Sequence, residues 1–239
     1  MKQRLDQTLV NKRLAPTRSQ AENLIKLGEV TVGGEVITKP GYFVGKDADI
    51  KVATDQSYVS RAALKLASIA DEFGLDFSDK VLLDVGSSTG GFTDFALQHG
   101  AKKSIAVDVG TDQLHPSLHD NLAIELHEQT DIRDMHELSA TPDIIVIDVS
   151  FISLREILPH VAKLSDPRTQ IVAMVKPQFE AGSSKKHKGI IKNDHMRREI
   201  LKGFEDWAKD YFIIQNKSDS KVAGSKGNVE RFYLLKRPS

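Results

Sequence analysis

The segment that most constrains the fold of this chain is Val81–Thr93, which reads VLLDVGSSTGGFT. A short apolar run precedes a glycine-rich turn, and the residues after the turn can begin a helix, which predicts a buried strand, a tight turn and a helix. Such turns lie at the carboxyl edge of open α/β sheets, where ligands bind. Three glycines would let a ligand approach the main chain because they carry no Cβ atom: Gly86, Gly90 and Gly91.

The spacing of these residues indicates an adenosyl ligand rather than a dinucleotide. The turn reads D-x-G-x-x-x-G-G from Asp84 and lacks the tight glycine pair that admits a pyrophosphate. Asp108 ends a second apolar run, about 20 residues after the glycines, where a carboxylate can accept both ribose hydroxyls. The alternative is a strand-to-helix turn without a ligand, and the combination of Asp84, the glycines and Asp108 argues against it.

Composition excludes several classes of protein but does not indicate a partner. The 239 residues suffice for one large core or for one core and a small module. Basic and acidic residues both number 33, so the net charge is zero. The absence of cysteine excludes a disulfide framework and a thiolate metal site, and it suits the cytoplasm. No apolar run approaches the ~18 residues of a membrane span, and no cluster has convincing metal-ligand spacing.

Residues 1–52 are predicted to form a small α+β unit. Helical spacing covers residues 5–14 and Ser19–Leu27, and Gly33-Gly34 is a hairpin signal between two short apolar stretches. The unit carries nine basic and six acidic residues. On charge alone, its basic residues could contact phosphates or could simply form a solvated helix face. Residues 53–57, ATDQS, are interpreted as a linker.

Strands and helices alternate from residue 58 to 239, which predicts a mostly parallel α/β domain. Helices are expected over 58–73, 91–99, 112–119, 153–164 and 194–210, and Pro116 interrupts the third of these. The last two strands are close in sequence, which predicts an antiparallel return. The expected strands are 81–85, 104–109, 123–127, 144–149, 171–175, 211–215 and 230–236.

Charged residues occur where three of these strands begin or end. Asp148 ends the run IIVID, Lys176 follows IVAMV, and Glu230 opens the last strand. Charges at the ligand-binding edge of a sheet seldom serve packing. The alternatives are a helix-capping carboxylate for Asp148, a loop lysine for Lys176 and an edge-strand charge for Glu230; Lys65, on the helix over 58–73, could be an exposed helix lysine.

The first module resembles a known RNA-binding domain. The R-L-D start, the T-R-S-Q-A segment, the L-G-E-V-T-V-G-G hairpin and the K-P-G of residues 4–41 are similar to those of an S4 domain. The resemblance implies that the second helix and the hairpin bind structured RNA.

The rest of the chain resembles FtsJ-type methyltransferases, and together with the S4 domain it resembles the TlyA/hemolysin A family of ribosomal RNA 2′-O-methyltransferases. The motifs are YVSRAALKL, DVGSSTGGFTDFAL, AVDVGTDQL, IVIDVSFISL, VKPQFEAG and GNVERFYLL. The implied fold is a Rossmann-like, seven-stranded, mostly parallel sheet. The implied catalytic tetrad is Lys65, Asp148, Lys176 and Glu230. The implied S-adenosylmethionine site contains Asp84, Gly86, Ser87, Gly90, Gly91, Phe92, Thr93, Asp108, Asp131 and Asp148.

The resemblance implies methyl transfer to a ribose 2′-hydroxyl, of a cytidine, in 16S and/or 23S ribosomal RNA within ribosomal subunits. Lys176 would deprotonate or orient the hydroxyl, and Asp148 would hold Lys176. Alternatives are a catalytically inactive RNA-binding or assembly protein, a small-molecule methyltransferase, or a hemolysin. A basic cluster after VKPQFEAG could bind RNA phosphate or could be a mobile loop: Lys185, Lys186, Lys188, Lys192, Arg197 and Arg198.

Overall fold

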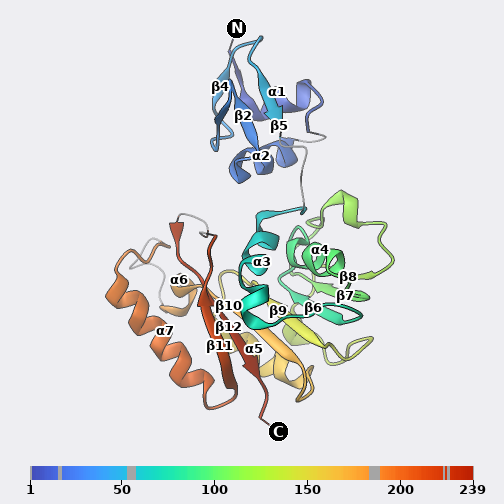
Figure 1. Ribbon diagram of the computed structural model, residues 1–239, viewed down its shortest axis with the longest axis vertical. Helices are drawn as coiled ribbons and strands as arrows, with labels where there is room; N and C mark the ends of the chain where they lie inside the picture. The colour runs from blue at the N-terminus through green and yellow to red at the C-terminus, as the bar shows by residue number, and fades with distance from the viewer. Residues whose placement is uncertain are drawn as a thin grey trace. The chain divides into compact units, whose positions relative to one another are not determined.

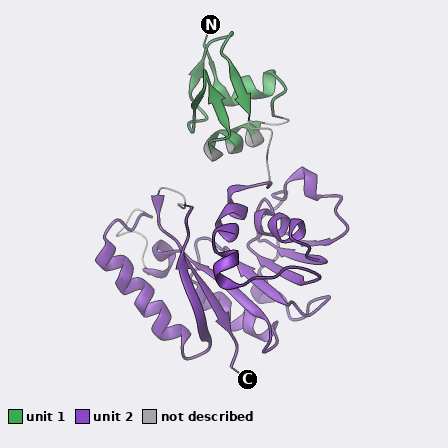
Figure 2. Ribbon diagram, viewed as in Figure 1, with its two compact units in different colours: residues 1–57 green, residues 58–239 purple. Residues whose placement is uncertain are grey.

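The chain forms two compact units, residues 1–57 and 58–239 (Figure 2). The computed structural model describes residues 2–15, 18–52, 58–182, 189–222, 224 and 227–238. The expected linker over 53–57 therefore lies outside the described residues.

The smaller unit has short strands around two helices. Its hairpin pairs β2 with β3, and both glycines between these strands have positive φ angles, as the turn requires. β5 pairs with the other side of β2, and β1 pairs with β4. The sequence did not predict β1, β4 and β5, because strands of two or three residues show almost no alternation and these, unlike β2 and β3, do not flank a glycine pair that signals a hairpin. The elements are β1 Gln3–Arg4, α1 Leu5–Asn11, α2 Arg18–Leu27, β2 Val30–Val32, β3 Glu35–Val36, β4 Phe43–Val44 and β5 Ile50–Val52.

The larger unit contains a seven-stranded sheet in the order β11-β12-β10-β9-β6-β7-β8. β12 runs antiparallel to both of its neighbours, and the other pairings are parallel, so the predicted fold class and the antiparallel return are confirmed. The strands are β6 Val81–Val85, β7 Lys103–Val107, β8 Ile124–His127, β9 Ile144–Ile147, β10 Gln170–Val175, β11 Ile213–Asp219 and β12 Arg231–Lys236. The helices are α3 Arg61–Phe73, α4 Gly91–Gln98, η1 Pro116–Leu118, η2 Ile132–Asp134, α5 Leu154–Lys163, α6 Pro177–Glu180 and α7 Asp194–Ala208.

Helices cover both faces of this sheet, and alternate residues of each central strand reach opposite cores (Figure 1). On β9, Ile145 and Ile147 pack with α5 and α7, whereas Ile144 and Val146 pack with α3 and α4. The same alternation occurs along β10 and β12. This burial on both faces explains why the sequence of β9 is an uninterrupted apolar run.

The expected helix over 112–119 and the helix N-termini show where local structure departs from simple sequence rules. The helix expected over 112–119 is reduced to the single turn η1, because Pro116 lacks an N–H and begins the helical turn rather than continuing one. Ser60 occupies the N-cap position of α3, but its hydroxyl makes no capping hydrogen bond. At α7 the N-cap residue is Asn193, whose side chain accepts a hydrogen bond from the backbone N–H of Met196.

Replacing Phe204 with alanine is expected to destabilise the larger unit by about 3–5 kcal/mol, because a fully buried ring would leave a cavity. Urea unfolding followed by the fluorescence of Trp207 measures this, since Trp207 is the single tryptophan and packs against Phe204. Leu122→Ala is the control, because Leu122 is fully exposed and its loss should leave the transition unchanged. An equal shift in both variants would contradict the prediction.

Candidate active site

Strand register brings the predicted charged residues to one edge of the sheet. β10 and β12 are paired up to Val175 and Arg231, so Lys176 and Glu230 occupy the next opposed positions. β6 and β9 are paired up to Val85 and Ile147, which places Gly86 beside Asp148. These residues come from four strands that lie next to one another in the order β12-β10-β9-β6.

Two glycines are required by close packing at this edge. A Cβ atom on Gly86 would lie 2.9 Å from the backbone oxygen of Asp148, and the φ angle of Gly86 is +82°. A Cβ atom on Gly91 would lie 2.2 Å from Ser60 Oγ and 2.9 Å from the Cβ of Ala62, at the start of α3. The glycine-rich turn is therefore packed between the Asp148 loop and α3.

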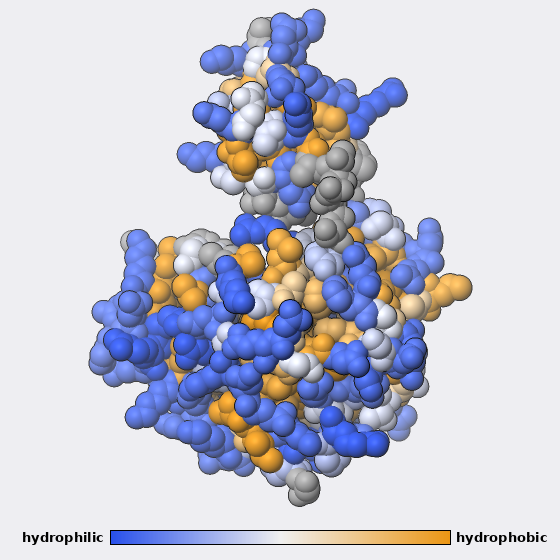
Figure 3. Space-filling model, viewed as in Figure 1, coloured by the Kyte–Doolittle hydropathy of each residue, from blue (hydrophilic) through white to orange (hydrophobic). Residues whose placement is uncertain are grey.

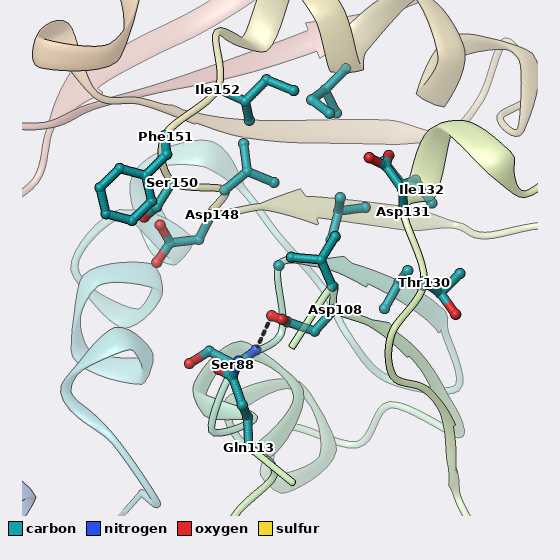
Figure 4. Close-up of a pocket in the computed structure, with 16 residues that line it drawn as sticks. Ser88, Asp108, Gln113, Thr130, Asp131, Ile132, Asp148, Ser150, Phe151 and Ile152 are labelled. Carbon is teal, nitrogen blue, oxygen red and sulfur yellow. Dashed lines mark hydrogen bonds between the residues drawn. The ribbon is translucent and has the colours of Figure 1, made fainter. Parts of the chain in front are cut away.

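Two adjoining cavities open at this edge. The larger has a volume of about 450 Å³, and its wall includes residues from the ends of β6, β7 and β9 (Figure 4). The smaller, of about 160 Å³, is lined by part of the glycine-rich turn (Asp84, Gly86–Thr89 and Phe92) and by Ala62 and Lys176. The cavities have four lining residues in common: Gly86, Ser88, Asp148 and Ser150.

Two of the carboxylates that line the larger cavity have different hydrogen-bond partners. Asp108 accepts hydrogen bonds from the backbone N–H of Ser88 at 2.8 Å, the bond drawn in Figure 4, and of Gly110 at 2.7 Å. Asp131 accepts three hydrogen bonds from Arg133, and this guanidinium keeps the pKa of the Asp131 carboxyl below its ordinary value. Among the described residues, only main-chain donors hold Asp108, whereas a neighbouring cation holds Asp131.

The smaller cavity contains buried oxygen atoms that lack partners. Asp84 Oδ2 accepts hydrogen bonds from the backbone N–H of Thr93 at 3.0 Å and from its hydroxyl at 2.8 Å. Asp84 Oδ1 and Ser87 Oγ have no partner among the described residues, although both are buried. Burial raises the pKa of Asp84 to about 7 despite the Thr93 hydrogen bonds.

These features fit a charged, nucleoside-containing ligand. Unpaired buried acceptors are costly, and a ligand with N–H or ammonium donors would satisfy them. Asp108 lines the other cavity and offers a carboxylate, the group that accepts ribose hydroxyls in many nucleotide sites.

The four expected catalytic residues form two ion pairs. Lys65 Nζ lies 2.5 Å from Glu230 Oε2, and their side chains are 13% and 3% exposed. Lys176 Nζ lies 2.5 Å from Asp148 Oδ1, with exposures of 10% and 15%. Apart from this ion pair, Asp148 Oδ1 has no hydrogen-bond partner among the described residues. Charges this buried are tolerated because each has an opposite charge in contact.

Sequence reasoning missed Ser150, which is in direct contact with Lys176. Lys176 Nζ donates a hydrogen bond to Ser150 Oγ at 2.8 Å and lies 6.0 Å from the centre of the Phe179 ring. Ser150 is two residues after Asp148, and that proximity is the one signal that could have identified it. Ser88, Gln113 and Thr130 also line the larger cavity and were not predicted.

Most of the expected ligand-binding residues line one cavity or the other. Gly90, Gly91 and Thr93 are absent from both described linings. Thr93 instead supports Asp84, and the N–H of Gly90 donates to Ser87 O at 2.7 Å within the turn. The lining residues among those predicted are Asp84, Gly86, Ser87, Phe92, Asp108, Asp131 and Asp148.

The expected basic cluster is only partly described. Lys185, Lys186 and Lys188 lie outside the described residues. Arg197 donates to Asp219 Oδ1 and to the backbone oxygen of Val229, and its side chain is only 14% exposed. Arg197 therefore supports the segment before Glu230, so it is poorly placed to contact phosphate.

Two family models match the chain. The FtsJ-like methyltransferase model matches residues 58–237, and the S4 domain model matches residues 3–50. The chain is 38% identical to the 23S rRNA (cytidine-2′-O)-methyltransferase TlyA of Campylobacter jejuni, over 94% of this chain and 96% of that protein. It belongs to the TlyA/hemolysin A family of FtsJ-like methyltransferases.

Other relatives are similar in sequence to this chain over most or nearly all of their length. Hemolysin A of Brachyspira hyodysenteriae is 37% identical, over 95% of this chain and 97% of that protein. The 16S/23S rRNA (cytidine-2′-O)-methyltransferase TlyA of Mycobacterium tuberculosis is 34% identical, over 98% and 89%. A solved structure from Streptococcus thermophilus is 36% identical with a TM-score of 0.78, and the match covers 100% of this chain and 89% of that one. The sequence-based family assignment is confirmed.

Among the described residues, none of the helices has the length and apolar character needed to cross a membrane. Hydrophilic side chains also cover much of the face of the larger unit shown in Figure 3, with hydrophobic ones in scattered groups.

Replacing Asp84 with asparagine should abolish part of the pH dependence of stability. Because the pKa of Asp84 is about 7 in the folded protein and 3.8 ordinarily, the folded state keeps a proton that the unfolded state loses between pH 4 and 7. The free energy of unfolding of the wild type should therefore fall as pH rises through this window. Relative to Asp84→Asn, the wild type should lose about 3 kcal/mol between pH 5 and pH 8.

Urea unfolding at several pH values measures this difference. Asp143→Asn is the control, because Asp143 is a partly exposed carboxylate that also accepts a main-chain hydrogen bond. Parallel pH curves for the wild type and Asp84→Asn would show that Asp84 titrates normally.

Proposed function

We propose that this protein transfers a methyl group from S-adenosylmethionine to the 2′-hydroxyl of a cytidine ribose in ribosomal RNA, within a ribosomal subunit. The proposal rests on one observation: the Lys176–Asp148 ion pair lies at the same edge of the sheet as two adjoining cavities. The names of relatives at 34% and 38% identity, which act on 16S/23S and 23S rRNA, support the substrate class.

The two cavities suit the two ends of the methyl donor. Asp108 would accept the ribose hydroxyls in the larger cavity, with Asp131 and Ile132 nearer the adenine. Asp84 Oδ1 and Ser87 Oγ would face the amino-acid end in the smaller cavity. Asp148 lines both cavities, so its carboxylate would lie near the sulfonium.

When bound, the donor supplies a methyl group that is attached to a positively charged sulfur. After the transfer, this sulfur is part of a neutral thioether, which is the leaving group. The ribose 2′-oxygen forms the new bond to the methyl carbon in line with the breaking carbon–sulfur bond. Lys176 Nζ first loses a proton from its ammonium to solvent and, as a neutral amine, orients the hydroxyl and takes its proton. Asp148 holds Lys176, and the Lys65–Glu230 pair places the ribose. Alignment of two bound reactants can supply a large share of the acceleration.

The proposal is tested with labelled S-adenosylmethionine and separated, unmodified small and large ribosomal subunits. Wild-type protein should label at least one subunit, and the modified position should resist alkaline cleavage, because a methylated 2′-oxygen cannot attack the adjacent phosphate. Lys176→Ala should lower the rate by at least ~100-fold while S-adenosylhomocysteine still binds.

Lys209→Ala is the matched control, because Lys209 is an exposed lysine at the end of α7 and its loss should change nothing. If folded, donor-binding wild-type protein labels neither subunit, the proposed reaction is wrong and an inactive RNA-binding role is favoured. Equal transfer by Lys176→Ala would retain the enzyme but remove Lys176 from the mechanism.

RNA binding by the smaller unit should depend on Arg18, at the start of α2. Its side chain is 53% exposed, and it shares the buried Asp6 carboxylate with Arg4. Arg18→Ala should raise the dissociation constant for ribosomal RNA and reduce the salt dependence by about one phosphate contact. Filter binding across a salt series measures this. Arg4 keeps Asp6 paired in the variant, so an unchanged salt slope in a folded protein would contradict the prediction.

A further inference from the structure

Glu180 is a buried carboxylate that the proposed mechanism does not use. Its side chain is 1% exposed, although it belongs to the short helix α6 next to the active site. Burial raises the pKa of its carboxyl above the ordinary value. An acidic group in such a place is costly unless it makes strong contacts, so its contacts indicate what it does.

Both oxygens of Glu180 are used by residues at the start of α5. Oε2 accepts a hydrogen bond from Ser153 Oγ at 2.6 Å, and Oε1 accepts one from the backbone N–H of Leu154 at 2.7 Å. Arg155 Nε lies 3.8 Å from Oε2 and supplies a partly exposed positive charge. Glu180 therefore joins two helices through a pair of short, specific hydrogen bonds.

The hydrogen bonds between Glu180 and the start of α5 form a junction close to the active site. One side of this junction is connected to Lys176, and the other side is connected to Asp148. Glu180 is four residues after Lys176, and Ser153 is five residues after Asp148 and three after Ser150. Between them, the rings of Phe151 and Phe179 lie 5.1 Å apart. Phe151 has a φ angle of +67°, a strained conformation that persists only where surrounding contacts enforce it.

We propose that Glu180 is a positioning residue, whose two hydrogen bonds hold the Asp148–Ser153 loop against α6 and so keep Lys176 Nζ in contact with Asp148 and Ser150. The two hydrogen bonds hold the loop in place, and the negative charge of Glu180 is not needed for this. Because it assigns a role within methyl transfer, this inference rests on the proposed function.

The variants separate geometry from charge. Glu180→Ala removes both acceptors and should lower kcat by at least ~10-fold, since a misplacement near 1 Å can cost 100-fold, with little change in the KM for the donor. Glu180→Gln keeps an acceptor for Leu154 and gains a donor for Ser153, so its kcat should stay within about threefold of wild type. The kcat of Ser153→Ala should lie between those of Glu180→Gln and Glu180→Ala. Adding Ser153→Ala to Glu180→Ala should cause no further loss of kcat.

Two controls address purely structural effects. Ser153 also caps α5, so Asn193→Ala, which removes the N-cap of α7, reports the cost of losing a cap alone. Glu125→Ala removes a carboxylate of the edge strand β8, far from α6 in the strand order, that accepts a hydrogen bond from Ser139 and pairs with Lys103. Both controls should keep the wild-type kcat per folded molecule.

A second measurement does not depend on catalysis. In protein carrying ¹⁵N-labelled lysine, the Nζ resonance of Lys176, assigned by its loss in Lys176→Ala, should be shifted and protected from exchange by its buried contacts. Glu180→Ala should broaden or remove this resonance, and Glu180→Gln should retain it.

The outcomes distinguish the two proposals. A wild type that transfers no methyl group but shows the expected resonances would refute the proposed function and keep the positioning role. Unchanged kcat and resonance in folded Glu180→Ala would overturn the positioning role, as would equal losses in Glu180→Gln and Glu180→Ala. If Glu180→Ala does not fold, the inference is tested with Ser153→Ala. A wild-type kcat and a wild-type Lys176 Nζ resonance in Ser153→Ala would overturn the inference.

Discussion

The candidate site depends on pairing opposite charges at the end of a sheet that is buried on both faces. Lys176 and Asp148 follow adjacent strands whose preceding residues lie in the two cores. An unpaired ion there would be costly, so each residue is stabilised by its partner. The parallel pairing of β9 and β10 supplies the partner by placing both strand ends at one edge.

The same constraint extends to the glycine-rich turn. Gly86 contacts the main chain of Asp148 so closely that a Cβ atom would displace the loop, and Gly91 packs against the start of α3. α3 in turn carries Lys65, which pairs with Glu230 at the start of β12. The cavities, the turn and both ion pairs are thus parts of one packed arrangement. A shift of the Asp148 loop would affect the surroundings of the ligand and of Lys176 together, which is why a fixed junction at Glu180 matters.

The sequence predicted most of this architecture for identifiable reasons. β6 has the predicted bounds, Val81–Val85, because its apolar run ends at a glycine turn. The Asp112–His119 helix was largely wrong because Pro116 allows a turn to begin but not a helix to continue through it. Arg197 belonged to an apparent basic cluster, yet it binds Asp219 and Val229, and charge counting along the chain cannot reveal such partners.

By itself the sequence determined the fold class, the order of strands and helices, and which charged residues end buried strands, because these follow from local periodicity and from turn residues. Only the tertiary structure decided which charged side chains contact one another. Lys65 and Glu230 are 165 residues apart, and Glu180 and Ser153 are 27 residues apart. Contacts of this kind depend on strand register and helix packing, which bring together residues that no local pattern connects.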